Sequence, residues 1–142
     1  AAADREAIDR ALAATDAGRL RDRIVTTLSG GERARVMLAR VFATEPGFIL
    51  ADEPVASLDP FHQLQVMDTL RAHASDGGGV LVVLHDLNLA ARYCDRLVAL
   101  DRGQVVCEGK PREVLENPAL AAAYSVRLDV VEEADGLWVR YR

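Results

Sequence analysis

The sequence predicts an α/β fold with a parallel sheet, because two apolar runs are separated by a helical segment. Residues 48–51 form an uninterrupted apolar run, typical of a strand covered on both faces of a parallel sheet. Residues 60–74 have helical spacing. Three glycines then end this pattern and precede a second apolar run at 80–84. A strand, helix and strand in this order form a right-handed crossover between parallel strands.

Helices are expected before this unit. Residues 4–14 place apolar side chains among charged ones at helical spacing, and Gly18 interrupts that pattern. A second helix is expected to begin at Ser29 and to continue until Pro46 and Gly47 break it.

The C-terminal part alternates short helices and hairpins. A short helix is expected over residues 87–93, followed by a hairpin whose turn contains Arg102 and Gly103 and which continues the sheet. Pro111 and Pro118 each stand where a helix can start. The tail then alternates around Gly136, which predicts a closing hairpin.

Composition places the chain among soluble globular domains. Its 142 residues are 50% hydrophobic and 27% charged, which suits one compact unit with a real core. The net charge of −5 argues against a nucleic-acid-binding surface, so no nucleic-acid partner is expected. No apolar run approaches the roughly 20 residues that span a bilayer, so we expect a cytosolic chain. Cys94 and Cys107 stand apart and receive no chemical role.

The first motif that could have a chemical function is Leu28-Ser29-Gly30-Gly31-Glu32. Ser29 can cap the following helix while the Glu32 carboxylate reaches back to the amide of the cap, which by itself is a capping box. The two glycines also allow a phosphate to approach bare backbone N–H groups at the positive end of the helix dipole. Both interpretations fit the motif taken alone.

The second motif is Asp52-Glu53, at the exit of the first apolar strand. Adjacent carboxylates are costly there unless hydrogen bonds or a metal compensate them. Asp52 suits the role of holding Mg²⁺, and Glu53 could accept a proton from a water that attacks a γ-phosphate. His85 follows the second strand, so we expect it beside the carboxylates, where it could bond a phosphate oxygen. The alternative is a pair of solvated carboxylates and a structural histidine.

A third motif, Ser57-Leu58-Asp59-Pro60, lies between the two strands. Asp59 could cap the crossover helix, and Pro60 suits its first position. Capping alone is a sufficient explanation locally.

Taken together and in this order, the three motifs and His85-Asp86 resemble the signature, Walker B, D-loop and H-loop of the ABC ATPases, which are P-loop NTPases. The resemblance covers nearly the whole chain and implies the C-terminal half of an ABC domain. That half would comprise part of a helical subdomain with the signature helix at 1–45, the sheet core at 46–109, and C-terminal helices with a hairpin at 110–142. Val55 departs from the pattern, since many members have threonine there.

The resemblance also implies roles for individual residues. The signature residues Leu28 to Glu32, chiefly Ser29, Gly30 and Gly31, would contact the γ-phosphate of ATP held by a facing subunit. Asp52 with Mg²⁺, and Glu53 and His85 as catalytic residues, would serve the chain's own nucleotide. Asp59 would act across the dimer interface.

Within the family, residues 85–96 most resemble ATPases that power uptake of iron-siderophore complexes, haem or vitamin B12 (cobalamin). Glu108-Gly109 and Val114-Leu115 support that resemblance, as do residues 120–126. It implies ATP and Mg²⁺ as cofactors, a second ATPase subunit and membrane permease subunits as partners, and a peripheral location on the inner face of the plasma membrane.

One part of the family pattern does not occur in these residues. The sequence contains no G-x-x-x-x-G-K-[ST], and Gly109-Lys110 lacks the upstream glycine. This motif forms the phosphate-binding loop, whose backbone and lysine hold a triphosphate. We therefore expect this chain alone to bind MgATP weakly and to hydrolyse it negligibly. Three alternatives stay open: an ABC ATPase of DNA repair or chromosome organisation, a non-catalytic regulatory or dimerisation fragment, and a piece with no independent role.

Overall fold

A computed structural model describes residues 2–134 and 136–142 and divides the chain into two compact units. The first unit ends at Val83 and the second runs from Leu84 to Arg142. Each unit has its own secondary structure and its own buried residues, and each is described by itself.

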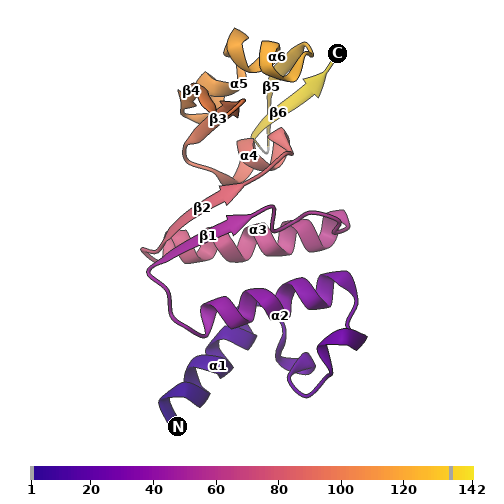
Figure 1. The fold of residues 1–142 in the computed structure, drawn as a ribbon, viewed down its shortest axis with the longest axis vertical. Coiled ribbons are helices and arrows are strands. Elements are labelled where there is room, and N and C mark those ends of the chain that lie inside the picture. The colour runs from indigo at the N-terminus through magenta and orange to yellow at the C-terminus, as the bar shows by residue number, and fades with distance from the viewer. Residues whose placement is uncertain (1, 135) are drawn as a thin grey trace. The chain divides into compact units, whose positions relative to one another are not determined.

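In the first unit, helices α1 and α2 precede a pair of parallel strands along the chain (Figure 1). Its elements in chain order are α1 Ala2–Ala14, the 3₁₀ helices η1 Gly18–Leu20 and η2 Val25–Thr27, α2 Gly30–Phe42, β1 Phe48–Asp52, α3 Pro60–Ser75 and β2 Gly79–Val83. The predicted helices and strands are all present, whereas the two 3₁₀ turns carry no periodic apolar pattern and were not expected. Helix α2 ends at Phe42, earlier than the proline that was expected to stop it.

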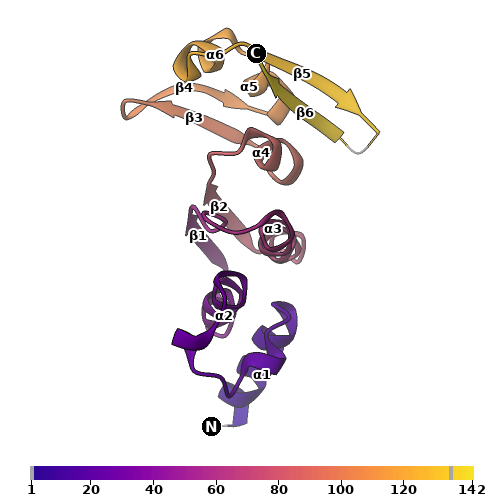
Figure 2. The same cartoon turned by 90° about the vertical axis from the view of Figure 1, so that its right-hand side faces the viewer.

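The predicted parallel crossover is confirmed. Strand β1 pairs with β2 in parallel, from Phe48 opposite Gly79 to Asp52 opposite Val83. Helix α3 connects the two strands and lies beside them in both views (Figures 1 and 2). The α3 residues Val66, Met67 and Leu70 are 2–3% exposed, so α3 contributes three large side chains to the core of this unit.

The expectation that β1 is covered on both faces is wrong for the described residues. Ile49 is 4% exposed, but Phe48 and Leu50 on the opposite face are 59% and 74% exposed. Leu81 and Val83 of β2 continue this open face at 57% and 48%. An apolar run shows that a strand can be covered on both sides, but it does not show where the second covering layer comes from.

The second unit consists of short helices and two hairpins (Figure 2), which contribute to one hydrophobic core. Its elements are α4 Leu87–Tyr93, β3 Leu97–Asp101, β4 Gln104–Gly109, α5 Pro111–Leu115, α6 Pro118–Tyr124, β5 Leu128–Glu133 and β6 Gly136–Tyr141. The core consists of five buried side chains, contributed by α4, α5, α6 and β6: Leu87, Val114, Leu115, Leu120 and Val139. The predicted proline starts of α5 and α6 and the closing hairpin β5–β6 are confirmed.

The hairpin β3–β4 forms a two-stranded antiparallel sheet of its own, rather than a continuation of the β1–β2 sheet as expected. Its two-residue turn has both Arg102 and Gly103 at positive φ, the geometry that matches the twist of a hairpin. One face of the hairpin packs on α5 and α6 through Leu97, Ala99 and Cys107, whereas Val98, Leu100 and Val105 on the other face are exposed. Periodicity identified the strands, but pairing depends on which backbone groups meet in space.

The side chain of Asn88 joins α4 to the last strand. Its Oδ1 accepts from the Val139 amide at 2.6 Å, and its Nδ2 donates to the Val139 carbonyl at 3.3 Å. The amide group of one side chain thus satisfies both backbone groups of a half-buried edge strand. No helix in the described part of the chain is long and apolar enough to cross a membrane.

Candidate functional site

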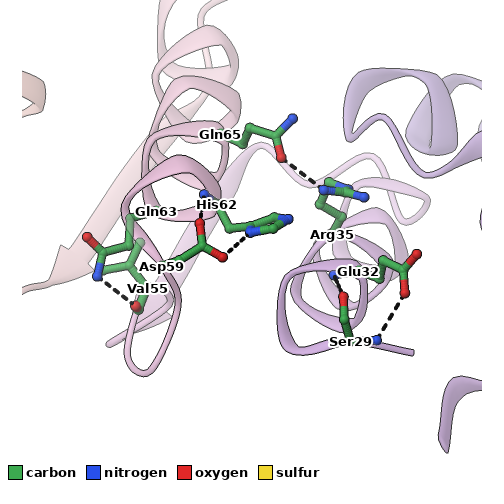
Figure 3. Close-up of polar contacts among 8 residues, drawn as sticks. All are labelled: Ser29, Glu32, Arg35, Val55, Asp59, His62, Gln63 and Gln65. Atoms are coloured by element: carbon green, nitrogen blue, oxygen red, sulfur yellow. Dashed lines mark hydrogen bonds and ion pairs between the residues drawn. The ribbon is translucent and has the colours of Figure 1, made fainter. Parts of the chain in front are cut away.

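The loop before α2 forms the capping box that the sequence predicts (Figure 3). Ser29 Oγ accepts from the Glu32 amide at 3.3 Å, and Glu32 Oε2 accepts from the Ser29 amide at 3.0 Å. The preceding Leu28 is extended and half-buried, and Gly30 and Gly31 form the first turn of the helix. The glycine turn is therefore held at a helix N-terminus, where backbone N–H groups favour an anion.

The carboxylate of Glu32 forms part of this cap. The backbone N–H of Ser29 donates to its carboxylate and lowers the pKa of Glu32, and the nearby Arg23 guanidinium lowers it further. Glu32 therefore stays ionised at neutral pH and stabilises the loop rather than taking up a proton.

The carboxylates of Asp52 and Glu53 lie at the C-terminal end of β1, and both residues are exposed. Asp52 is the last residue of the strand, opposite Val83 of β2. The Glu53 amide donates to the Val83 carbonyl at 3.2 Å, which ties the residue to the neighbouring strand. Ligands of open α/β sheets bind at this edge of the strands.

Glu53 has an unusual backbone conformation, with φ of +46°. A non-glycine residue in the left-handed region costs on the order of 1 kcal/mol and is found preferentially at functional sites. Ser57 in the same loop also has positive φ, at +62°. The loop turns back through the Ala56 amide, which donates to the Glu53 carbonyl at 3.1 Å.

Asp59 caps helix α3 as predicted, and both of its carboxylate oxygens are bonded to the same residue. Oδ1 accepts from the His62 amide at 3.1 Å, and Oδ2 lies 2.5 Å from His62 Nδ1. An ionised carboxylate has no proton to donate, so the histidine Nδ1 carries the hydrogen of this bond. The hydrogen bond from the ring, followed by that from the amide, lowers the pKa of Asp59.

Two residues that were not predicted from the sequence, His62 and Arg35, connect α2 with α3. The ring of His62 lies against Gly31, so closely that a side-chain methyl at Gly31 would overlap it. Arg35 is 4% exposed, and its Nη1 donates to Gln65 Oε1 at 2.9 Å. The D-x-x-H spacing was a detectable signal for the bonds between Asp59 and His62, whereas nothing local predicts the contact of His62 with Gly31 or the burial of Arg35.

His85 follows β2 and belongs to the second unit, where it is exposed. Its expected position beside Asp52 and Glu53 therefore stays a prediction. Asp86, next to it, caps α4 by accepting from the amides of Asn88 at 2.7 Å and Leu89 at 3.1 Å.

The carboxylates of Asp52 and Glu53 suit a cation that binds together with a nucleotide better than a metal that the protein alone holds. Among residues 2–134 and 136–142, no group of three or more His, Cys, Asp and Glu side chains could hold a metal. Mg²⁺ is commonly held by one or two carboxylates together with phosphate oxygens and water. An exposed Asp52 beside Glu53 at a strand end fits that partial role.

Comparison with known proteins supports one family. Residues 2–56 match the family described as ABC transporter. The chain is 48% identical over 128 residues to the haemin import ATP-binding protein HmuV of Pseudomonas entomophila, covering 87% of this chain and 50% of that protein. It is also 48% identical over 129 residues to HmuV of Rhodococcus jostii, covering 91% of this chain and 44% of that protein. The chain thus spans about half the length of these relatives.

Solved structures share the fold. A metal-chelate type ABC transporter in an inward-facing conformation superposes with a TM-score of 0.84 at 24% identity, covering 96% of this chain and 55% of that chain. The ATP-binding cassette MJ1267 in its ADP conformation superposes with a TM-score of 0.77 at 27% identity, covering 84% of this chain and 49% of the other. The ordered motifs, the sequence relatives and the fold agree, and the chain belongs to the ABC transporter ATPase family.

Proposed function

We propose that these residues provide the signature, Walker B, D-loop and H-loop segments of an ATP-hydrolysing importer subunit. The feature that carries the proposal is Glu53, which follows β1 in a strained left-handed conformation and is bonded to the neighbouring strand. Strain of this kind persists only where the surrounding structure enforces it. A carboxylate held at a strand end in this way is placed to take a proton from an attacking water.

The other residues take complementary roles in this proposal. Asp52 would hold Mg²⁺, which supplies charge neutralisation at phosphate oxygens when it is bound. His85 would bond a phosphate oxygen of the same nucleotide. Ser29, Gly30 and Gly31 would offer backbone N–H groups to the γ-phosphate of ATP held by a second ATPase subunit. Asp59 would act at the interface with that subunit.

The substrate class follows from the relatives. Proteins 48% identical to the chain are named haemin import ATP-binding proteins, and a structure with the same fold is a metal-chelate type transporter. These similarities support a motor for uptake of haem or of another metal chelate, such as an iron-siderophore or cobalamin. In such a machine the subunit would attach to membrane permease subunits at the inner face of the plasma membrane.

Substitution of Glu53 by glutamine in a full-length subunit that contains these residues tests the proposal. Glu53→Gln should retain ATP binding and lower kcat for ATP hydrolysis by about 10²- to 10⁴-fold, because a proton acceptor is lost while the side-chain shape is kept. Glu45→Gln is a matched control, since Glu45 also has positive φ, at +48°, but precedes β1 instead of following it. Equal hydrolysis by the Glu53→Gln and wild-type subunits would refute the assigned role.

The isolated 142-residue chain should behave differently from the full-length subunit. We expect it to bind MgATP weakly and to hydrolyse it negligibly, since its residues include no phosphate-binding loop motif. Calorimetric titration with MgATP and a phosphate-release assay on the purified chain measure both properties. Sustained turnover by the chain alone would contradict this part of the proposal.

A further inference from the structure

We propose that His62 is a positioning residue that orients the Asp59 carboxylate and keeps it in register with the glycine turn of α2. The inference rests on the proposed function, because Asp59 and Gly31 matter to catalysis only if the chain works as an ABC ATPase. It concerns a residue outside every motif that the sequence analysis identified. Three observations within the first unit support it.

The first observation is that His62 bonds both oxygens of the Asp59 carboxylate. The amide bond at 3.1 Å to Oδ1 is an ordinary helix cap, which any residue at position 62 except proline could make. The ring bond at 2.5 Å to Oδ2 is specific to this side chain. With both oxygens bonded, rotation of the carboxylate about its Cβ–Cγ bond is restricted, which favours one direction for its remaining lone pairs.

The second observation is that the same ring packs on the signature helix. A methyl group at Gly31 would overlap the Cδ2, Cγ and Nε2 atoms of His62, so the ring fills the space that a side chain would occupy. Gly31 is itself buried, and the His62 ring points from α3 towards α2 (Figure 3). Gly31 therefore has a structural reason to be glycine that is independent of any bound phosphate.

The third observation is a second polar link between the same two helices. Arg35 lies one turn beyond Gly31 on α2 and donates to Gln65, which lies nearly one turn beyond His62 on α3. The other guanidinium nitrogens of Arg35, Nε and Nη2, are buried without a hydrogen-bond partner. A buried cation with one neutral partner has few alternative positions, so the two helices are held in one register along their contact.

A displacement of α2 would consequently be transmitted through the imidazole to Asp59. Packing on Gly31 fixes the ring, and the ring fixes the carboxylate. The glycine turn of α2 and the Asp59 carboxylate would then move together. Of the two contacts of the ring, the donor at Nδ1 acts directly on the Asp59 carboxylate, whereas the packing on Gly31 supports the position of the ring.

Two substitutions separate these properties in the full-length subunit. His62→Phe keeps a ring against Gly31 but removes the donor to Asp59, whereas His62→Asn keeps a donor on the atom attached to Cγ but removes the ring. We expect His62→Phe to lower kcat for ATP hydrolysis by about 10- to 100-fold with little change in KM, because a misoriented group affects the reacting complex. His62→Asn should recover at least half of the wild-type kcat.

The matched control is His73→Phe, the same change at the other α3 histidine whose ring packs on a glycine, in this case Gly78. It should leave kcat within about twofold of wild type, because no motif residue bonds His73. If His62→Asn is as impaired as His62→Phe, or if neither variant loses activity, the positioning role is wrong. An equal loss in His73→Phe would assign the effect to α3 stability and would also overturn the proposal.

The geometry can be tested in the 142-residue chain without ATP, which distinguishes failure of this inference from failure of the proposed function. Two-dimensional ¹H–¹⁵N spectra of the imidazole side chains should show a hydrogen on His62 Nδ1, with a downfield proton shift that is lost in Asp59→Ala. Observation of an unprotonated Nδ1 in the wild-type chain would overturn the inference regardless of any ATPase result. An inactive wild-type subunit that shows the expected spectrum would refute the proposed function and leave the His62 contact established.

Discussion

Both units of the chain bury a core and leave apolar strand residues exposed, but they differ in how much of the candidate site they contain. In the first unit, Phe48, Leu50, Leu81 and Val83 form an open apolar face on the β1–β2 sheet. In the second unit, hairpins and short helices surround a core in which Leu115 is 1% exposed, while Val98, Leu100 and Val105 form an exposed apolar face on the β3–β4 hairpin. The motifs that carry the proposed chemistry, apart from His85, lie in the first unit.

The comparison teaches that the candidate site in the first unit combines buried side chains, such as Val55 at 8% exposure, with local hydrogen bonds. Local hydrogen bonds hold it: the reciprocal cap at Ser29 and Glu32, the pairing of Asp59 with His62, and the bond from Glu53 to the neighbouring strand. Such bonds contribute about 0.5–1.5 kcal/mol each, whereas burying one large apolar side chain contributes about 1.5–3 kcal/mol. Mutations should therefore affect the two units by different mechanisms and by different amounts.

The largest effect is expected from removing core volume in the second unit. Leu115→Ala should lower the free energy of unfolding by about 2–5 kcal/mol, because it leaves a cavity among fully packed neighbours. Urea unfolding followed by circular dichroism measures the loss, and amide hydrogen exchange assigns it to the second unit. Leu100→Ala is the control, since Leu100 is 67% exposed. Equal losses of stability for the two variants would contradict the packing of Leu115 in the core of this unit.

A smaller effect is expected from the polar link in the same unit. Asn88→Ala should cost about 1–3 kcal/mol, because the amide and carbonyl of Val139 lose their partner in a half-buried environment. Exchange of the Val139 amide should accelerate more than that of Val130, which pairs with it across the hairpin. Unchanged protection at Val139 would show that β6 does not need Asn88.

In the first unit, the cap of α2 should matter less than a core residue. Ser29→Ala should lower stability by about 1 kcal/mol, because one of the two bonds of the capping box is lost. Thr26→Ala, at an exposed position in the preceding 3₁₀ turn, is the control. Thermal unfolding of both variants measures the difference, and a Ser29→Ala variant as stable as the control would argue that the loop is held by other contacts.

The smallest effect on stability is expected on the open face. Leu50→Thr should change the free energy of unfolding by less than about 0.5 kcal/mol, because Leu50 is 74% exposed and threonine suits a strand. The same change should reduce binding of a hydrophobic dye and self-association in sedimentation, since it interrupts the apolar patch. A loss above about 2 kcal/mol would mean that the face is covered within this chain, contrary to the structure.

Much of the first unit was predictable because its signals are local. The capping residues Ser29 and Asp59 act on amides three residues away, so their motifs specify the contact regardless of the rest of the fold. The parallel pairing of β1 and β2 also followed from the order of strand, helix and strand. Residue roles in ATP hydrolysis, by contrast, rest on the family resemblance and stay proposals.

What could not be predicted depends on distant residues meeting. Nothing near Arg35 in sequence indicates that it is buried against Gln65, and nothing near Gly31 indicates that a histidine ring occupies its side-chain space. The separate β3–β4 sheet was missed for the same reason, because an apolar strand pattern does not identify its pairing partner.

By itself, then, the sequence determined the α/β class, the order of the elements and the positions of the helix caps, since these follow from interactions among near neighbours. Only the tertiary structure decided which sheet face is open, how α2 contacts α3, and that Glu53 takes a left-handed backbone. These features arise from packing between segments that are far apart in the chain, and residue type alone does not encode which surfaces will meet.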